Sequence, residues 1–151
     1  MSTLDTLDQN IVCDDALFTP WVKADAIIGN PPFLGGNRMR AELGNEYVEQ
    51  IYKKFSEVKG QVDFCTYWFR KAIENIEKTT RVGLVGTNSI TQNVSRKASL
   101  DYVIKNGGYI HEAISSQEWS GDAVVHVSIV KTNTFTNQPV NFTNCIANWI
   151  N

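Results

Sequence analysis

The sequence predicts an α/β domain with a mostly parallel sheet. Short runs of β-branched and apolar residues alternate with longer stretches of helical spacing, which is the order of strand-helix-strand units. The chain has 151 residues, of which 42% are hydrophobic, so it can bury one core. We therefore expect a single domain over residues 1–151, with its core at about 10–132. Residues 133–151 form an extension with weak periodicity.

The first half of the chain predicts two strands and two helical regions. Residues 10–13 and 24–29 are expected to be short buried strands, because both runs are β-branched and bounded by turn residues. Residues 37–60 are polar, with Tyr47, Ile51 and Phe55 near helical spacing, which predicts a loop and an amphipathic helix. Residues 62–76 carry a broad apolar stripe and predict a stronger helix.

The second half predicts one helix between strands. Residues 81–87 are typical of a buried strand in a parallel sheet. A helix is expected at 95–106, where Gly107 and Gly108 provide a stop signal. Two last strands are expected at 109–113 and 123–131.

Composition excludes several classes of protein. A net charge of −2 gives no global basic signature, so a nucleic-acid surface would have to be local. The three cysteines lie far apart and the two histidines do not complete a ligand set, so no metal site is expected. The same cysteine pattern predicts a reduced cytoplasmic protein without structural zinc. Neither a membrane span nor a secretory signal is visible.

The most informative motif is Asn30-Pro31-Pro32-Phe33, which follows the apolar run 26–29. The exocyclic amine of a nucleobase is a poor nucleophile, because its lone pair is delocalised into the ring. The side-chain oxygen of Asn30 and the carbonyl of Pro31 can accept both amine protons and turn the lone pair toward an electrophilic methyl group. The prolines stiffen the loop and Phe33 offers a flat face for stacking. The alternative is a strand that ends in a rigid turn.

This motif resembles the catalytic Asp/Asn-Pro-Pro-Tyr/Phe motif of S-adenosylmethionine-dependent amino-methyltransferases, and its form is most similar to DNA adenine-N6 enzymes. Extended through Leu34-Gly35-Gly36, it resembles the methyltransferase part of single-chain type II restriction-modification enzymes. The resemblance implies a class I methyltransferase (Rossmann-like) fold whose sheet ends in an antiparallel hairpin. It also implies in-line methyl transfer to adenine N6 of a base flipped out of double-stranded DNA.

The resemblance implies S-adenosylmethionine as cofactor and suggests where it binds. Asp15 precedes Ala16-Leu17 and matches the acidic residue that accepts from the cofactor's adenine amine better than Asp14 does, although either carboxylate could instead cap a local turn. Phe64 matches a position packed beside that adenine, with a core role as the alternative. Asn30 is also expected to contact the cofactor.

Trp119 is the candidate partner of Phe33 in holding the flipped base. It precedes the final strand, where similar DNA adenine enzymes carry an aromatic side chain. Stacking of this kind contributes about 1 to 3 kcal/mol per base in single-strand binders, which helps to offset unstacking. The alternative is a loop tryptophan folded onto the core.

The family's glycine-rich cofactor loop and ribose-binding carboxylate do not appear before residue 10. We therefore expect a truncated or excised C-terminal portion of a methyltransferase catalytic domain, inactive alone. In the usual strand order of this fold, the missing first strand lies beside residues 24–29. We therefore expect an exposed sheet edge there. That edge predicts self-association or pairing with a separate N-terminal half.

Two other functions fit the motif. Similar enzymes use it to methylate a guanine amine in ribosomal RNA or a glutamine amide in a protein. The chain could also be a non-catalytic remnant that binds DNA or a partner chain. Binding of S-adenosylmethionine distinguishes the last class from the others.

Overall fold

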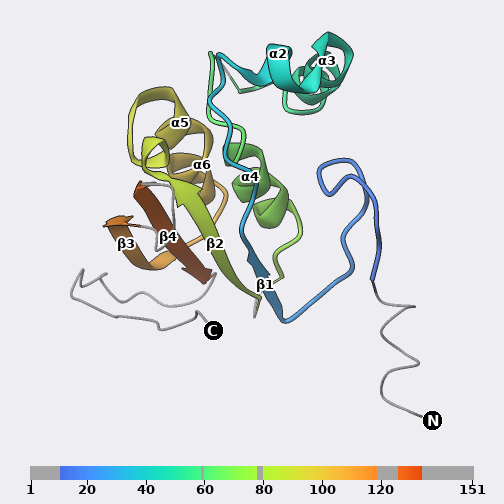
Figure 1. The fold of residues 1–151 in the computed structure, drawn as a ribbon. Helices are drawn as coiled ribbons and strands as arrows, with labels where there is room; N and C mark the ends of the chain where they lie inside the picture. The colour runs from blue at the N-terminus through green and yellow to red at the C-terminus, as the bar shows by residue number, and fades with distance from the viewer. Residues whose placement is uncertain (1–10, 59, 78–79, 119–125, 134–151) are drawn as a thin grey trace.

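The computed structural model describes residues 11–58, 60–77, 80–118 and 126–133, and within them it confirms an α/β fold (Figure 1). The strands are β1 (Ala26–Gly29), β2 (Arg81–Thr87), β3 (Ile110–Glu118) and β4 (His126–Asn133). The helices are α2 (Met39–Leu43), α3 (Asn45–Lys54), α4 (Thr66–Glu74), α5 (Asn93–Ala98) and α6 (Leu100–Lys105), with a 3-10 turn, η1, at Asn88–Thr91.

The described strands form one sheet in the order β1-β2-β4-β3. Parallel pairing is confined to β1 and β2, and the expected antiparallel hairpin is confirmed in β3 and β4. Gly29 pairs with Leu84, so β2 continues past the end of β1 to Thr87. Both strands run toward the end of the sheet at which α2 and α3 lie (Figure 1).

Strand β1 lies at an edge of the described sheet, as expected, but it is not buried. It begins at Ala26 rather than at residue 24, and Ile28 is 85% exposed. The prediction of a buried strand was wrong because burial depends on neighbours on both sides, and β1 has a described neighbour only in β2.

The predicted strand at 10–13 is not formed in its described part, residues 11–13. Ile11 and Val12 are 69% and 68% exposed. β-branched composition does not make a strand without a ladder partner, and no described strand pairs with this segment.

The helix expected at 62–76 is confirmed but begins later, at Thr66. The helix expected at 95–106 begins earlier, at Asn93, and is divided into α5 and α6 at Ser99, whose hydroxyl donates to the Ser95 carbonyl at 2.7 Å. Its predicted stop is confirmed, because the amides of Gly107 and Gly108 donate back to the last turn of α6 in a Schellman arrangement.

Two apolar clusters meet at α4. The first contains residues of the N-terminal segment, α2, α3 and the start of α4, with Leu17, Val48, Ile51 and Tyr67 fully buried. The second joins α4 to β2 and η1. Strand β2 contributes alternate side chains, Val82 and Leu84, so only one of its faces is fully buried.

Candidate functional site

The Asn30-Pro31-Pro32-Phe33 segment directly follows β1 at the carboxyl end of the parallel strand pair. Asn30 and Pro32 are exposed, whereas Pro31 is buried. No hydrogen bond joins the exposed Asn30 side chain to the part of the chain that the structure describes, so its amide oxygen remains a potential acceptor. Phe33 is half-buried and packs on the second cluster. Exposed and buried residues alternate here because the chain leaves the sheet with one side packed against the core.

The loop that continues from this motif is fixed to the segment before α4. We call residues 30–36 the motif loop. The amide of Phe64 donates to the carbonyl of Leu34 at 2.8 Å. An added Cβ on Gly36 would lie 2.4 Å from the carbonyl oxygen of Val62, so the two backbones are in close contact. The Leu34-Gly35-Gly36 extension therefore allows this approach.

Asp15 lies in a tight turn and caps it. Its Oδ1 accepts the amide of Leu17 at 2.8 Å, which is the turn-capping role considered as an alternative. The carboxylate also interacts with the hydroxyl of Tyr47 in α3. Burial, reinforced by this nearby carboxylate, raises the pKa of the Tyr47 hydroxyl. Asp14 is exposed and accepts the amide of Asp15 at 2.8 Å.

Two lysines hold the segment that carries Asp15. The buried Lys71 of α4 donates to the carbonyls of Leu17 at 3.2 Å and Thr19 at 2.8 Å. Lys54 of α3 donates to the same Leu17 carbonyl. Burial, with a smaller contribution from Lys54, lowers the pKa of Lys71. This N-terminal segment is therefore anchored to α3 and α4 without regular secondary structure of its own.

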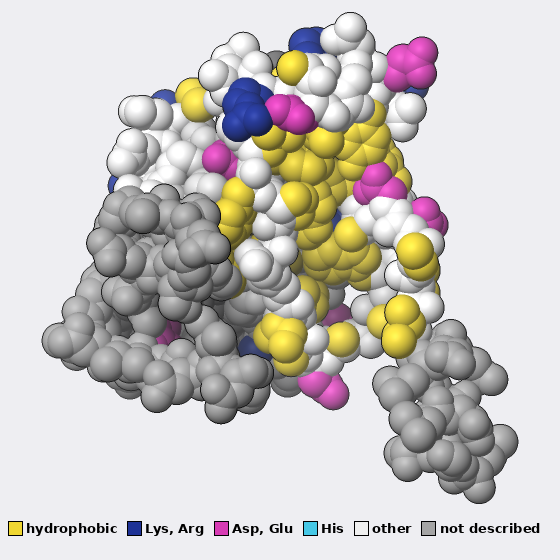
Figure 2. Space-filling view, in the orientation of Figure 1, with side chains coloured by type: hydrophobic (Ala, Val, Ile, Leu, Met, Phe, Trp, Pro, Cys, Tyr) yellow, Lys and Arg dark blue, Asp and Glu magenta, His cyan; other side chains and the backbone are white. Residues whose placement is uncertain are grey.

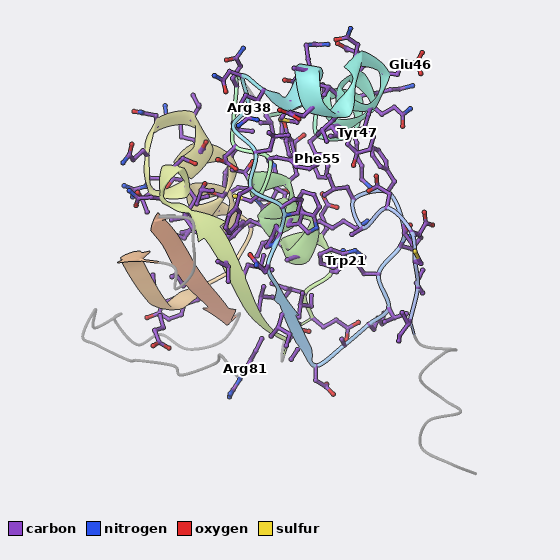
Figure 3. All side chains as sticks on the ribbon, viewed as in Figure 1. Trp21, Arg38, Glu46, Tyr47, Phe55 and Arg81 are labelled. Carbon is purple, nitrogen blue, oxygen red and sulfur yellow. The ribbon has the colours of Figure 1, made fainter. Side chains whose placement is uncertain are left out.

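Aromatic rings connect Asp15's turn to α4. Phe18 contacts Tyr47 with centroids 5.7 Å apart, Tyr47 contacts Phe64 at 6.4 Å, and Phe64 contacts Trp68 at 4.8 Å. All three contacts are edge-to-face. Figure 2 shows hydrophobic side chains in a band below α2 and α3, beside the N-terminal segment. Figure 3 places Tyr47 on the side of α3 that faces this segment, with Trp21 further along.

Asp15 and Phe64 thus both interact with Tyr47. The sequence predicted only that Tyr47 lies on a helix. Phe64 is 5% exposed and its ring packs in the first cluster. Trp119 lies outside the described residues. Tyr47 could have been singled out only by its helical spacing with Ile51 and Phe55.

Two ion pairs lie at α2 and between α2 and α3. Arg38 binds Glu42 and Arg40 binds Glu49, each at 2.6 Å between nitrogen and oxygen, and all four side chains are substantially exposed. Such pairs are typical of a solvated helical face. In the described part of the chain there is no group of three potential metal ligands and no helix long and apolar enough to cross a membrane.

The strand order, the carboxyl-end motif loop and the hairpin define a class I S-adenosylmethionine-dependent methyltransferase fold. One solved structure of this class is a putative methyltransferase from Listeria monocytogenes. The alignment covers 84% of this chain and 37% of the Listeria protein, with a TM-score of 0.52 and 15% identity. Residues 4–143 match the family described as "MmeI, DNA-methyltransferase domain". The chain therefore belongs to the MmeI DNA-methyltransferase domain family.

Two of the proteins that this chain resembles are much longer than the chain. The type IIL restriction-modification enzyme MmeI, solved in complex with DNA, has 26% identity and a TM-score of 0.67, covering 82% of this chain and 18% of that chain. DNA methyltransferase A of Bacillus subtilis (strain 168) is 25% identical, covering 80% of this chain and 15% of that protein. The chain thus spans less than a fifth of the length of either relative.

Proposed function

We propose that this domain transfers a methyl group from S-adenosylmethionine to the N6 amine of adenine in double-stranded DNA. The observation that carries the proposal is the exposed Asn30 at the carboxyl end of β1, preceding the buried Pro31. The Asn30 amide oxygen and the Pro31 carbonyl are acceptors on adjacent residues, as required to bind the two protons of one amine. Membership of a DNA-methyltransferase family supports DNA as the substrate.

In this mechanism the protein orients the amine and holds the ring. Asn30 and Pro31 accept the amine protons, so the nitrogen lone pair is directed at the methyl group while no charged base is needed. Phe33 is half-buried against the core, which leaves part of its ring to contact a flipped base. We assign Trp119 the opposite side of the base.

The fit of the cofactor rests on the band of rings between Asp15 and α4. A flat adenine with an exocyclic amine suits aromatic edges beside a carboxylate, which accepts from amines. We propose that Asp15 binds the adenine amine through its remaining acceptor sites, with Phe64 and Asn30 nearby. S-adenosylmethionine, when bound, supplies the electrophilic methyl group.

We further propose that the chain acts as the C-terminal portion of a catalytic domain in a restriction-modification system of the cytoplasm. The exposed edge at β1 supports a partner strand there, either from a second copy or from an N-terminal half. The isolated chain is then expected to have little activity.

The direct test is methyl transfer from labelled S-adenosylmethionine to adenine-containing DNA, with the product base identified by mass spectrometry. Asn30→Ala is expected to abolish N6-methyladenine, whereas Asn37→Ala, a change at another exposed asparagine nearby, is expected to retain it. Methylation of a guanine amine in RNA or of a glutamine amide, with none in DNA, would replace the proposed acceptor.

Cofactor binding is tested separately by calorimetry of the whole chain with S-adenosylmethionine. Saturable binding that Asp15→Ala weakens would support the cofactor assignment. The absence of heat at millimolar ligand would favour a non-catalytic remnant, and methylation assays of this chain alone would then be expected to fail.

A further inference from the structure

A closed network of polar side chains lies where α4 begins and β2 ends. The Oδ1 of Asp63 accepts the amide of Cys65 at 3.3 Å, and its Oδ2 accepts the hydroxyl of Ser89 at 3.1 Å. The hydroxyls of Ser89 and Thr87 are 2.7 Å apart, and Thr87 Oγ1 lies 3.8 Å from Cys65 Sγ. The ring of contacts thus returns to Cys65, whose amide donates to Asp63.

The hydroxyl and thiol protons of this network allow only one direction of hydrogen-bond donation. The Ser89 hydroxyl has a single proton, which it gives to the carboxylate of Asp63, so Thr87 must donate to Ser89. Thr87 can then only accept from the Cys65 thiol. Burial, aided by the nearby charge of Asp63, raises the pKa of this thiol to about 12, consistent with a bound proton. The chain of donors ends at Asp63.

Asp63 also connects to α5 and to the motif loop. Its amide donates to the Ser95 hydroxyl at 3.1 Å. The next residue, Phe64, donates its amide to Leu34, and Val62 on the other side touches Gly36. Phe33 packs on the cluster that includes Cys65, which is a partner of Asp63, and Ile90, which follows Ser89 in the chain. Asp63 therefore bonds to α5 and η1, and its neighbours on both sides in the chain hold the motif loop.

We propose that Asp63, through Ser89 and Cys65, is a positioning residue that fixes the motif loop relative to the carboxyl end of β2. The carboxylate is buried, with 9% exposure, so it acts through these partners rather than on a substrate. Hydrogen bonds to an ionised acceptor are stronger than neutral ones, which makes this side chain effective in joining α4 to β2. The catalytic consequence rests on the proposed function, whereas the position of the loop does not.

The test uses the full chain labelled with fluorophenylalanine, with the Phe33 fluorine resonance assigned by its loss in Phe33→Leu. Asp63→Asn and Ser89→Ala are expected to shift this resonance. Thr91→Val is the matched control, because it removes a hydroxyl from the same η1 turn. Within the described residues this hydroxyl donates to the Asn88 carbonyl and is not part of the network around Asp63. Ser89→Ala keeps the test usable where Asp63→Asn does not fold, and melting temperatures are measured for each.

Kinetics supply a second readout. In a chain that methylates DNA, Ser89→Ala is expected to lower kcat, by up to about 100-fold for a misplacement of the order of 1 Å, with KM for S-adenosylmethionine unchanged. A lowered melting temperature with an unmoved Phe33 resonance would overturn the proposal, because Asp63 would then only stabilise α4. A moved resonance with an unchanged kcat, in a chain that methylates DNA, would support the position of the loop and contradict its catalytic consequence.

Discussion

The main-chain amide of Phe64 donates to the carbonyl oxygen of Leu34 across 2.8 Å, joining the motif loop to the start of α4. The two residues are far apart in sequence, and both neighbour a feature of the candidate site. Leu34 follows the half-buried Phe33, and Phe64 contacts Tyr47. One backbone hydrogen bond therefore links the proposed amine-binding loop to the proposed cofactor-binding rings.

Gly36→Ala is expected to destabilise the protein and displace the motif loop. The new Cβ would approach the backbone of Val62 and Gln61 to within 2.4 and 2.8 Å, and backbone atoms cannot give way as a flexible side chain can. We expect a loss of about 1–3 kcal/mol in the free energy of unfolding, measured by urea denaturation. Gly83→Ala is the control, since its Cβ meets only Ile28 at 3.8 Å. Equal stability of both variants would contradict this contact.

Local signals in the sequence predicted most of the described elements. Strand β2 and helices α3 and α4 follow from short-range periodicity, and the stop at Gly107 and Gly108 follows from turn chemistry that needs no distant partner. The division at Ser99 was missed because a single serine hydroxyl competes for a helical carbonyl, and the apolar pattern of 95–106 does not reveal it.

The misses share a dependence on residues distant in sequence. The exposure of β1 depends on which strands lie beside it, and residues 11–13 have the composition of a strand but no described partner. The network around Asp63 and the anchoring by Lys71 join segments with no common motif. The motif loop itself could be predicted because its prolines restrict the chain locally.

Arg70→Lys is expected to destabilise the protein despite the retained charge. The guanidinium of Arg70 is 3% exposed, lies 3.6 Å from the centre of the Tyr102 ring and binds Glu57 at 3.0 Å. Lysine cannot reproduce this stacked planar contact, so we expect a loss of about 1–3 kcal/mol in the free energy of unfolding. Arg38→Lys, at an exposed pair, should change it by less than about 0.5 kcal/mol. An equal loss in the free energy of unfolding for both variants would contradict the stabilising role of the Arg70–Tyr102 contact.

Lys71 should make stability depend on alkaline pH. Burial lowers its pKa below the ordinary 10.5, so above the folded-state pKa the unfolded chain binds more protons than the native one. Stability contributed by this group therefore rises with pH between its folded pKa and 10.5, and is lost as pH falls through the folded pKa. In urea denaturation at several pH values, the free energy of unfolding of wild type relative to Lys71→Met should increase as the pH rises through this window. A constant difference across this window would argue against the lowered pKa.

Cys65 should be unreactive in the native protein. Its thiol is fully buried, and burial together with the charge of Asp63 raises its pKa to about 12, so little thiolate is present at pH 8. In Cys13→Ser/Cys145→Ser, a disulfide reagent should label Cys65 only after unfolding. The exposed Cys13, left alone in Cys65→Ser/Cys145→Ser, should react at once. Rapid native labelling of Cys65 would show that the network around Asp63 opens readily.

Ile28→Lys should reduce association of the chain with itself or with a strand-forming partner. Ile28 is 85% exposed on β1, at an edge of the described sheet, and an apolar edge strand offers both side chain and backbone groups to another strand. A charge at this position opposes such pairing because it must be desolvated. Light scattering coupled to size exclusion should report a smaller species than wild type. Ile104→Lys, at 58% exposure on α6, is the control and should leave the mass unchanged. A wild-type chain that is monomeric at all concentrations would exclude self-association, and the edge would then be available only to a different chain.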